Sequence, residues 1–214
     1  NQKVSMVGLR RIITGLLYCC FLCSSAHASD NEVYLEQVGS NHDTDFEQVG
    51  VGNYIDAVQS GDDLDLYISQ DGNGNEALAY QTGSDLEARI EQDGNNNSAE
   101  IEQEGSNNFA QIVQQGNNND ALIEQDGSGN TAIAEQYGSD NYAALYQVGA
   151  NNYAYAEQTG SGNSVTVEQF GNGNNSENIQ VGNNNSIEAY QHGSGMEAHV
   201  EQHGDNLHVT ITSE

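Results

Sequence analysis

Hydrophobic and polar residues alternate in short runs along most of the chain. In one such run, Asn119, Ala121, Ile123 and Gln125 occupy every second position, and two of the three residues between them are acidic. Because successive side chains of a β-strand point to opposite faces, these four residues share one face. The pattern therefore predicts a strand of about seven residues with an inward face of Asn, Ala, Ile and Gln.

This run belongs to a repeat of eleven residues. Gln recurs sixteen times without a break from Gln37 to Gln202, and Gly follows each Gln two positions later, from Gly39 to Gly204. Asn stands five positions after the Gln in eleven copies, and Ala stands seven positions after it in nine. An eleven-residue period also suits a helix of roughly 3.67 residues per turn. The two-residue alternation and the Gly in every copy exclude that helix.

The repeat predicts a stack of flat coils. Glycine two positions after the Gln supplies a tight turn, because it tolerates a positive φ and a close approach of backbones. One strand cannot bury its inward face, whereas two successive copies can bury theirs against each other, so 22 residues form one coil of two strands. Coils then stack at the ~4.8 Å spacing of cross-β structure. The predicted fold is all-β, an amyloid-like β-solenoid of about eight such coils.

The inward amides are predicted to form ladders along the stack, in which each bonds to identical neighbours above and below. The pattern is most regular in the middle, since His42, Leu64 and Leu86 replace the Asn near one end and Met196 and Leu207 near the other. The predicted ladder residues of the middle are Gln92, Gln103, Gln114, Gln125, Gln136, Gln147, Gln158, Asn97, Asn108, Asn119, Asn130, Asn141 and Asn152. The turn glycines of these copies are Gly94, Gly105, Gly116, Gly127, Gly138, Gly149 and Gly160.

The composition is strongly acidic and contains no proline. The formal net charge is −28, and all 32 acidic residues lie after residue 29. Such a surface repels nucleic acid and anionic lipid, so neither is predicted as a partner. A polar, acidic composition is also typical of disordered chains, but those have no need to hold a register. The lack of proline agrees with a stack in which nearly every backbone N–H bonds to a neighbouring strand.

The amino-terminal residues have the pattern of a secretory signal peptide. A basic start precedes an apolar run at 12–22, and a small-x-small pattern predicts cleavage between Ala28 and Ser29. The apolar run is too short for a membrane span, so no membrane insertion of the mature chain is predicted. All three cysteines lie before the cleavage point, which leaves the mature chain without a disulfide. The predicted units are a signal peptide at 1–28, a short leader at 29–32 and the repeat solenoid at 33–213.

The repeat Gln-x-Gly-x-x-Asn-x-Ala-x-x-x-Gln, as it runs from Gln125 to Gln136, resembles the curlin repeat of curli, the extracellular amyloid fibres of bacterial biofilms. The resemblance covers about residues 33–213. It implies a secreted structural subunit that polymerises with copies of itself at the bacterial cell surface, in a pilus-like or fimbrial fibre for adhesion and matrix formation. It also implies a nucleator subunit and an outer-membrane secretion pore as partners.

Both ends of the predicted solenoid carry the repeat rather than a polar cap. They should therefore offer open strand edges, through which copies polymerise end to end. Two other functions remain open: the nucleating minor subunit of such a fibre, and a monomeric exported solenoid that binds surfaces or cations. Outward acids that stack on one another, such as Glu102 with Glu124 and Glu135 with Glu157, are predicted to slow premature assembly.

No catalytic, cofactor or metal site is predicted. The serines have no His and Asp partners at defined positions, and the outward carboxylates have no predicted cleft that would raise a pKa. His192, His199, His203 and His208 separate when they are placed on the coil, whereas metal ligands must converge on one ion. An enzyme built on a parallel β-helix would carry acids on irregular loops, and this repeat contains no insertion.

Overall fold

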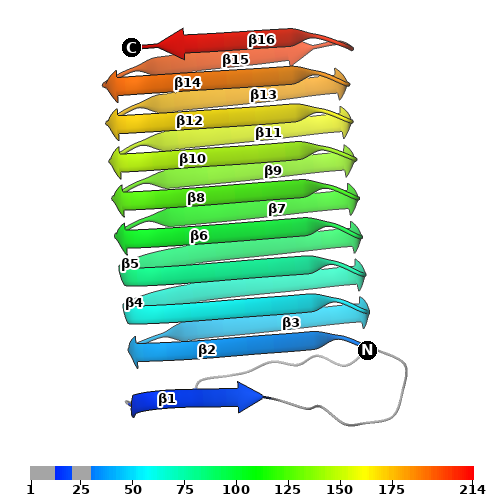
Figure 1. The fold of residues 1–214 in the computed structure, drawn as a ribbon. Coiled ribbons are helices and arrows are strands. Elements are labelled where there is room, and N and C mark those ends of the chain that lie inside the picture. Colours follow the sequence, from blue (N-terminus) through cyan, green and yellow to red (C-terminus); the bar gives the residue numbers. More distant parts are fainter. Residues whose placement is uncertain (1–12, 21–29) are drawn as a thin grey trace.

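The chain winds into a single stack of β-strands (Figure 1). The computed structural model describes residues 13–20 and 30–214. Within these residues, no helix is long and apolar enough to cross a membrane. The strands are β1 (Ile13–Cys20), β2 (Glu32–Ser40), β3 (Asp43–Val51), β4 (Tyr54–Asn73), β5 (Glu76–Asn95), β6 (Ser98–Ser106), β7 (Phe109–Asn117), β8 (Asp120–Ser128), β9 (Thr131–Ser139), β10 (Tyr142–Ala150), β11 (Tyr153–Ser161), β12 (Ser164–Asn172), β13 (Asn175–Asn183), β14 (Ser186–Ser194), β15 (Glu197–His203) and β16 (His208–Ser213).

The strands alternate between two facing sheets. β4 and β5 each run through a turn and belong to both sheets, so the solenoid from β2 to β16 has seventeen strand segments. The front sheet of Figure 1 consists of β2, residues 54–62, residues 76–84, β6, β8, β10, β12, β14 and β16. The back sheet consists of β3, residues 65–73, residues 87–95, β7, β9, β11, β13 and β15.

Neighbouring strands of each sheet are parallel and in register at a separation of 22 residues. Tyr142 pairs with Ser164, and Gln147 pairs with Gln169 five residues later. This confirms the predicted 22-residue coil and the all-β solenoid of about eight turns. As the chain climbs in Figure 1, the front strands run to the left and the back strands to the right, so the solenoid is left-handed.

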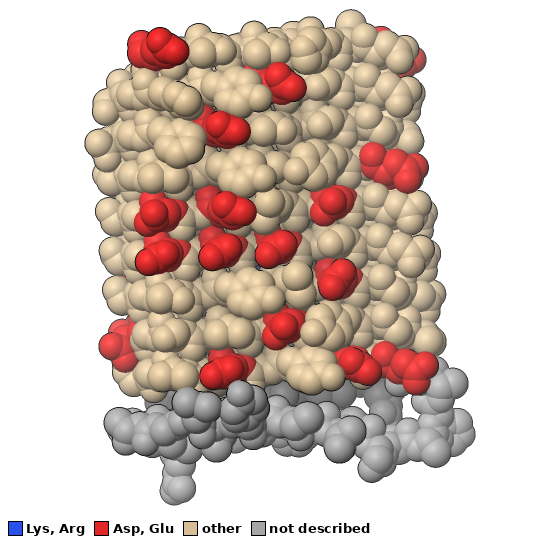
Figure 2. Space-filling model, in the orientation of Figure 1, with Lys and Arg blue, Asp and Glu red and all other residues tan. Residues whose placement is uncertain are grey.

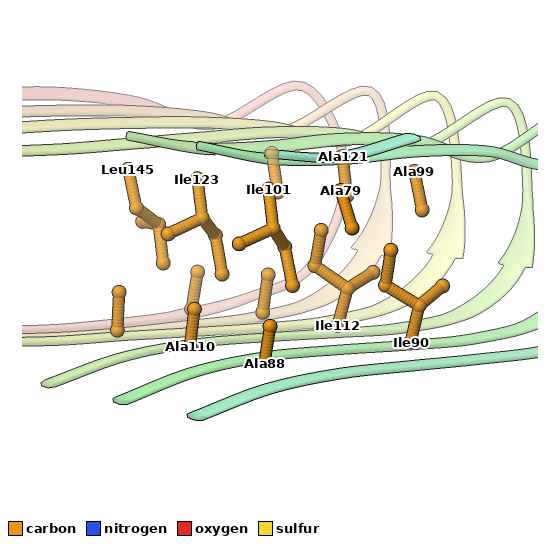
Figure 3. Packing of buried hydrophobic residues seen from close by; sticks show 14 of the residues in the cluster. Ala79, Ala88, Ile90, Ala99, Ile101, Ala110, Ile112, Ala121, Ile123 and Leu145 are labelled. Carbon is orange, nitrogen blue, oxygen red and sulfur yellow. The ribbon is translucent and has the colours of Figure 1, made fainter. Parts of the chain in front are cut away.

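The core lies between the two sheets and is narrow. Along β8, the inward residues Ala121, Ile123 and Gln125 are buried while the residues between them face outward. Large side chains of one sheet lie opposite alanines of the other, as Ile101 and the alanines of β5 and β7 show in Figure 3. Alternating large and small residues allow the sheets to approach closely without leaving voids. The small Ala of the repeat therefore sets the sheet separation.

β1 lies outside this core. It pairs antiparallel with β2, and it pairs with no other strand of the described residues. It falls within the predicted signal peptide, whose predicted cleavage point between Ala28 and Ser29 is outside the described residues. The core cluster of residues 30–214 is formed by side chains of strands β2 to β16.

Every turn holds one residue in the left-handed conformation, four positions after the Gln. This position is Gly, Asn or Asp in all copies, for example Gly129 (φ 67), Asn118 (φ 56) and Asp140 (φ 56). These residue types tolerate positive φ best. The sequence pattern singles out the glycines of this set, whereas the shared backbone conformation explains why Asn and Asp substitute for them.

The Gly two positions after the Gln is required for a different reason. Gly127 has a φ of 126, and a Cβ built on it would overlap the carbonyl oxygen of Gly149 in the next coil. The same overlap with backbone recurs at the other glycines of this position that have a coil above them. The backbones of successive turns touch there, so any side chain would force the coils apart.

Replacing this glycine should therefore be far more damaging than replacing a glycine at the left-handed turn position. For Gly173→Ala, where φ is 65 and no atom lies within 4 Å of the added Cβ, only backbone strain of about 1–2 kcal/mol is expected. For Gly127→Ala, the clash should cost at least about 3 kcal/mol of unfolding free energy. Urea unfolding of the soluble chain, followed by circular dichroism, measures both; equal losses would contradict the close contact of turns.

Candidate functional site

Two ladders of buried glutamine run along the stack, one in each sheet. Each Gln from Gln37 to Gln180 donates from Nε2 to Oε1 of the Gln 22 residues later, at 2.7–3.0 Å. The second Nε2 hydrogen crosses to the opposite sheet; Gln125, for example, donates to the carbonyl oxygen of Phe109 at 3.0 Å. Each amide therefore joins both successive coils and the two sheets. The predicted rungs from Gln92 to Gln158 all lie in these ladders and are buried.

The asparagines are also buried, but they bond mainly to backbone. The N–H of Asn130 donates to Oδ1 of Asn108 at 3.0 Å, and Nδ2 of Asn130 donates to the carbonyl oxygen of Gly149 at 3.0 Å. Direct bonds between side chains occur at some rungs only, such as Asn119 to Asn97 at 3.2 Å. An Asn rung thus holds the turn glycine of the coil above. The sequence predicts bonds between the side-chain amides of successive Asn rungs. The backbone partners could not be predicted, because the sequence does not show in which direction the N–H groups of the turn point.

The Asn stacks stop at the carboxyl end of the solenoid. The N–H of Met196 donates to Oδ1 of Asn174 at 3.1 Å, and the N–H of Leu207 donates to Oδ1 of Asn185 at 3.0 Å. Neither Met196 nor Leu207 has a side-chain amide that could bond to a further coil. The turns at Met196 and Leu207 therefore lack the side-chain bond to the turn glycine of the next coil that Asn130 makes.

A pair of adjacent glutamines allows a direct test of the ladder. Gln114 is fully buried and bonds to Ser98 at 2.7 Å, to Gln136 at 2.9 Å and, as acceptor, to Gln92 at 2.9 Å. Its neighbour Gln115 is exposed. Gln114→Ala leaves three buried partners unpaired and should cost about 3 kcal/mol or more of unfolding free energy. Gln115→Ala should change it by less than about 0.5 kcal/mol. Urea denaturation midpoints compare the two variants, and similar midpoints would refute the ladder as a stabilising element.

Six carboxylates gather on the outward face of the front sheet, where Figure 2 shows two adjacent rows of acids. In these rows Glu102 pairs with Glu124, and Glu104 pairs with Asp126, on neighbouring strands. Like charges therefore stack at the ~4.8 Å strand spacing, where repulsion is strong. We name this group the acidic cluster; it consists of Glu100, Glu102, Glu104, Asp120, Glu124 and Asp126.

Glu100 occupies the least favourable place in the acidic cluster. Its neighbours on the strands below and above are Leu78 and Leu122. Partial burial, followed by the nearby charges of Glu102 and Asp120, raises the pKa of Glu100 above its usual value. A carboxyl whose pKa is raised by folding binds its proton more tightly in the folded state. Its contribution to stability therefore improves as the pH falls through the folded-state pKa towards the unfolded-state value.

Glu100→Gln should stabilise the solenoid at neutral pH by a few tenths to about 1 kcal/mol, because it removes a partly desolvated charge from a like-charged group. The gain should shrink as the pH is lowered towards about 4, where the wild-type carboxyl takes up a proton. Glu91→Gln is the matched control, since Glu91 is exposed on the back sheet between Ser69 and Val113. Denaturation midpoints at several pH values give the readout; an equal gain for both variants would contradict the role of the cluster.

A shallow hollow adjoins the acidic cluster where the front strands end. Its volume is about 310 Å³. Burial and the charges of Glu102 and Glu100 raise the pKa of Glu124 in its wall. The sequence predicts no such hollow, because its walls come from strands 22 residues apart. Its charged and apolar lining includes Glu102, Glu104, Glu124, Asp126, Glu168, Tyr146, Val148 and Phe170.

The four histidines near the carboxyl end do not converge on one point, although His199 and His203 both contact Glu201. His199 bonds to two carboxylates, with Nδ1 3.0 Å from Oε2 of Glu177 and Nε2 3.2 Å from Oε1 of Glu201. His192 packs edge-on against the ring of Phe170, with centroids 5.1 Å apart. Across residues 30–214, no group of three or more His, Cys, Asp or Glu side chains is arranged to hold a metal ion.

Both ends of the solenoid expose part of the core. At the carboxyl end, Val209 and Ile211 of β16 are only partly buried; at the amino end, the same holds for Val33 and Leu35 of β2. Their equivalents in the middle, such as Ile123, are fully buried. Among the described strands, β15 and β16 have a neighbour on one side only, so apolar side chains and strand edges are presented along the stack axis at the carboxyl end. At the amino end β3 likewise has one neighbour, whereas β1 pairs with the outer edge of β2.

The Curlin associated repeat model matches the chain at residues 61–94, 85–116, 94–127, 105–138, 116–148, 138–171 and 182–214. Together these matches span residues 61–171 and 182–214, which is more than half of the chain. No curated protein matches it. The ladder residues from Gln92 to Gln158 and the turn glycines from Gly94 to Gly160 lie within the matched residues. The chain belongs to the family of proteins built from curlin-associated repeats.

Proposed function

We propose that this chain is a secreted structural subunit of curli-like amyloid fibres, which polymerises end to end at the bacterial cell surface. The observation that carries the proposal is the state of the two ends. The repeat and the apolar core continue to β15 and β16 at the carboxyl end and to β2 and β3, next to the antiparallel β1, at the amino end; the core residues of β2 and β16 are only partly buried. Solenoids that remain monomeric normally end in polar caps.

An open strand edge is a template for another chain, because its N–H and C=O groups lack partners on one side. A second copy that adds to β15 and β16 would pair these groups and cover Val209 and Ile211. The same interactions that hold successive coils together would then hold successive subunits together. Membership of the curlin-repeat family supports this role, and it supports a structural rather than a catalytic function.

Export through an outer-membrane pore and a nucleator subunit belong to the same proposal.

The acidic cluster supports a controlled form of assembly. Stacked carboxylates such as Glu102 and Glu124 oppose close association of copies until counter-ions or protons reduce their charge. Added salt, or a pH near 4, should therefore shorten the lag before fibres form.

The direct test is to incubate purified residues 29–214 and examine the product. Fibres with a meridional reflection at ~4.8 Å are expected, and they should form faster in salt. A chain that stays monomeric at high salt would contradict the proposal and favour an exported solenoid that binds surfaces or cations. Activity only as a seed for another fibre protein would favour a nucleator.

Two lysine variants test whether the carboxyl end is the growing surface. Ile211→Lys places a charge at an inward position of β16, where the next copy would have to bury it, so elongation should slow at least about tenfold. Thr212→Lys places the same charge on the outward face of the same strand, where residue 212 is exposed, and elongation should change little. Thioflavin fluorescence after seeding gives both rates. Equal rates would exclude this end as an assembly surface.

A further inference from the structure

From β2 to β16, residues 32–213 form an odd number of strand segments, and this restricts how two copies of residues 29–214 can be joined end to end. Seventeen segments follow one another alternately in the front and back sheets, so that β2 and β16 both lie in the front sheet. We infer that consecutive subunits of the fibre are related by about half a turn around the fibre axis, so that β2 of one copy pairs with β15 of the copy below and β3 pairs with β16. The inference rests on the proposed end-to-end polymerisation.

Strand spacing gives the first argument. Successive strands of one sheet lie ~4.8 Å apart, and the two sheets are offset by half of that rise because the chain climbs continuously. If the next copy kept the same orientation, β2 would meet β16, but β3 would lie about two strand spacings from β15. A gap the width of one strand would remain in the back sheet, with unpaired backbone groups on both sides. A half turn closes this gap, and every strand then has a neighbour at one spacing.

The upper end of the back ladder provides an unused donor. Gln202 accepts a bond from Nε2 of Gln180 at 3.0 Å and donates one Nε2 hydrogen to the carbonyl oxygen of Ser186 at 3.2 Å. In every lower rung, the other Nε2 hydrogen bonds to the Gln above. Among the described residues, no further acceptor is bonded to the Nε2 of Gln202. This hydrogen faces the position of the next coil.

The lower end of the front ladder provides the matching acceptor. Nε2 of Gln37 donates to Oε1 of Gln59 at 2.7 Å and to Oγ1 of Thr44 at 2.8 Å. No described residue donates to Oε1 of Gln37. The half turn places Gln37 of one copy above Gln202 of the other, where the ladder bond can form. The half turn also places Gln48 of β3 above Ser213, the residue of β16 that pairs with Gln191 and has no amide, so it forms one of the two ladder bonds. Without the half turn, Gln37 would lie above Ser213 and the gap would separate Gln48 from Gln202, so neither ladder bond would form.

Apolar packing by itself does not choose between the two orientations. The half turn sets Val33 and Leu35 above Val200 and its strand neighbour Ala198 in β15, whereas the unrotated arrangement sets them above β16, whose inward residues are also apolar. The outward residues of the half-turn junction do not favour this orientation either, since Glu36 would lie above Glu201 and the two carboxylates would repel each other. The number of strands and the amide rungs therefore decide the orientation.

The half turn also distributes charge along the fibre. The acidic cluster lies on the front sheet only, so it would alternate between opposite sides of the fibre from one subunit to the next. Half-turn subunits of seventeen segments rise by about 41 Å at ~4.8 Å per coil. That separation is several times the ~8 Å screening length at physiological salt, so clusters of neighbouring subunits would repel each other little there. At low salt the screening length is about 30 Å, and the clusters would oppose assembly.

Cysteine pairs in residues 29–214 test the orientation, since this part of the chain has no cysteine of its own. It is used because β1 occupies the edge of β2 in the full chain, and because residues 29–214 contain every residue of the core cluster described above. In the half-turn fibre, residues 36 and 201 of adjacent copies are in-register neighbours at ~4.8 Å, which lies within the usual Cα range of a disulfide. In the unrotated fibre, residue 36 instead neighbours residue 212.

Fibres of Glu36→Cys/Glu201→Cys and of Glu36→Cys/Thr212→Cys are grown under reducing conditions and then oxidised. We expect a ladder of covalent multimers for the first pair and monomers for the second on a non-reducing gel. Multimers of the second pair alone would overturn the half turn and leave end-to-end polymerisation intact. Absence of fibres from the wild-type chain, or fibres in which neither pair links, would overturn both. Dimers of the single variant Glu201→Cys would show contact between like ends and would overturn the half turn as well.

A truncation separates strand number from local sequence. Removing residues 207–214 deletes β16, which pairs only with β14 among the described strands, and leaves sixteen segments. The half turn should then be lost, and residue 36 should neighbour residue 190 in β14. Glu36→Cys/Tyr190→Cys should therefore link in the truncated fibre, while Glu36→Cys/Glu201→Cys should not. Continued linking of the latter pair would overturn the argument from the odd number of strands.

Discussion

In-register stacking of equivalent residues is the interaction on which the whole structure depends. Each strand pairs with the strand 22 residues away, and this pairing places every Gln of the repeat directly above another. The Gln amide then bonds along the stack and across to the other sheet, as Gln125 does with Gln147 and Phe109. Because each buried Gln side chain bonds both to the next coil and to the opposite sheet, a core of small Ala and few large side chains suffices. The register also requires Gly where successive turns touch.

The same stacking that joins identical amides also joins identical charges. Glu102 lies next to Glu124 on the front sheet, and Glu135 lies next to Glu157 on the back sheet. The back pair shares a donor, since the hydroxyl of Tyr155 bonds to Glu135 at 3.2 Å and to Glu157 at 3.0 Å. The two pairs are therefore not equivalent. The back sheet carries an acidic stack of its own, in which Asp65 lies between Asp43 and Glu87. On the proposed function, attraction along the axis and repulsion between outward acids would make fibre assembly depend on salt and pH.

Much of this architecture follows from local pattern, and the exceptions show its limit. The alternation of Asn119, Ala121 and Ile123 reveals a strand, and the fixed period reveals the coil. Asn178 stands where the repeat requires an apolar residue; it is fully buried, and its Oδ1 has no partner among the described residues. The hollow near Glu124 could not be predicted, because residues from several coils form it. The bond made by each Asn rung could not be predicted either, because turn geometry directs it.

The sequence alone determined the strand, the 22-residue coil, the ladder positions and the turn glycines, since each depends on residues at most two repeats apart. Only the tertiary structure decided the left-handed winding, the neighbours of Glu100 and the bonding of the two end rungs, Gln37 and Gln202. These features depend on which faces meet and in what direction the chain climbs. An eleven-residue period is compatible with left-handed or right-handed winding, whereas the packing of the two sheets in three dimensions permits only one of them.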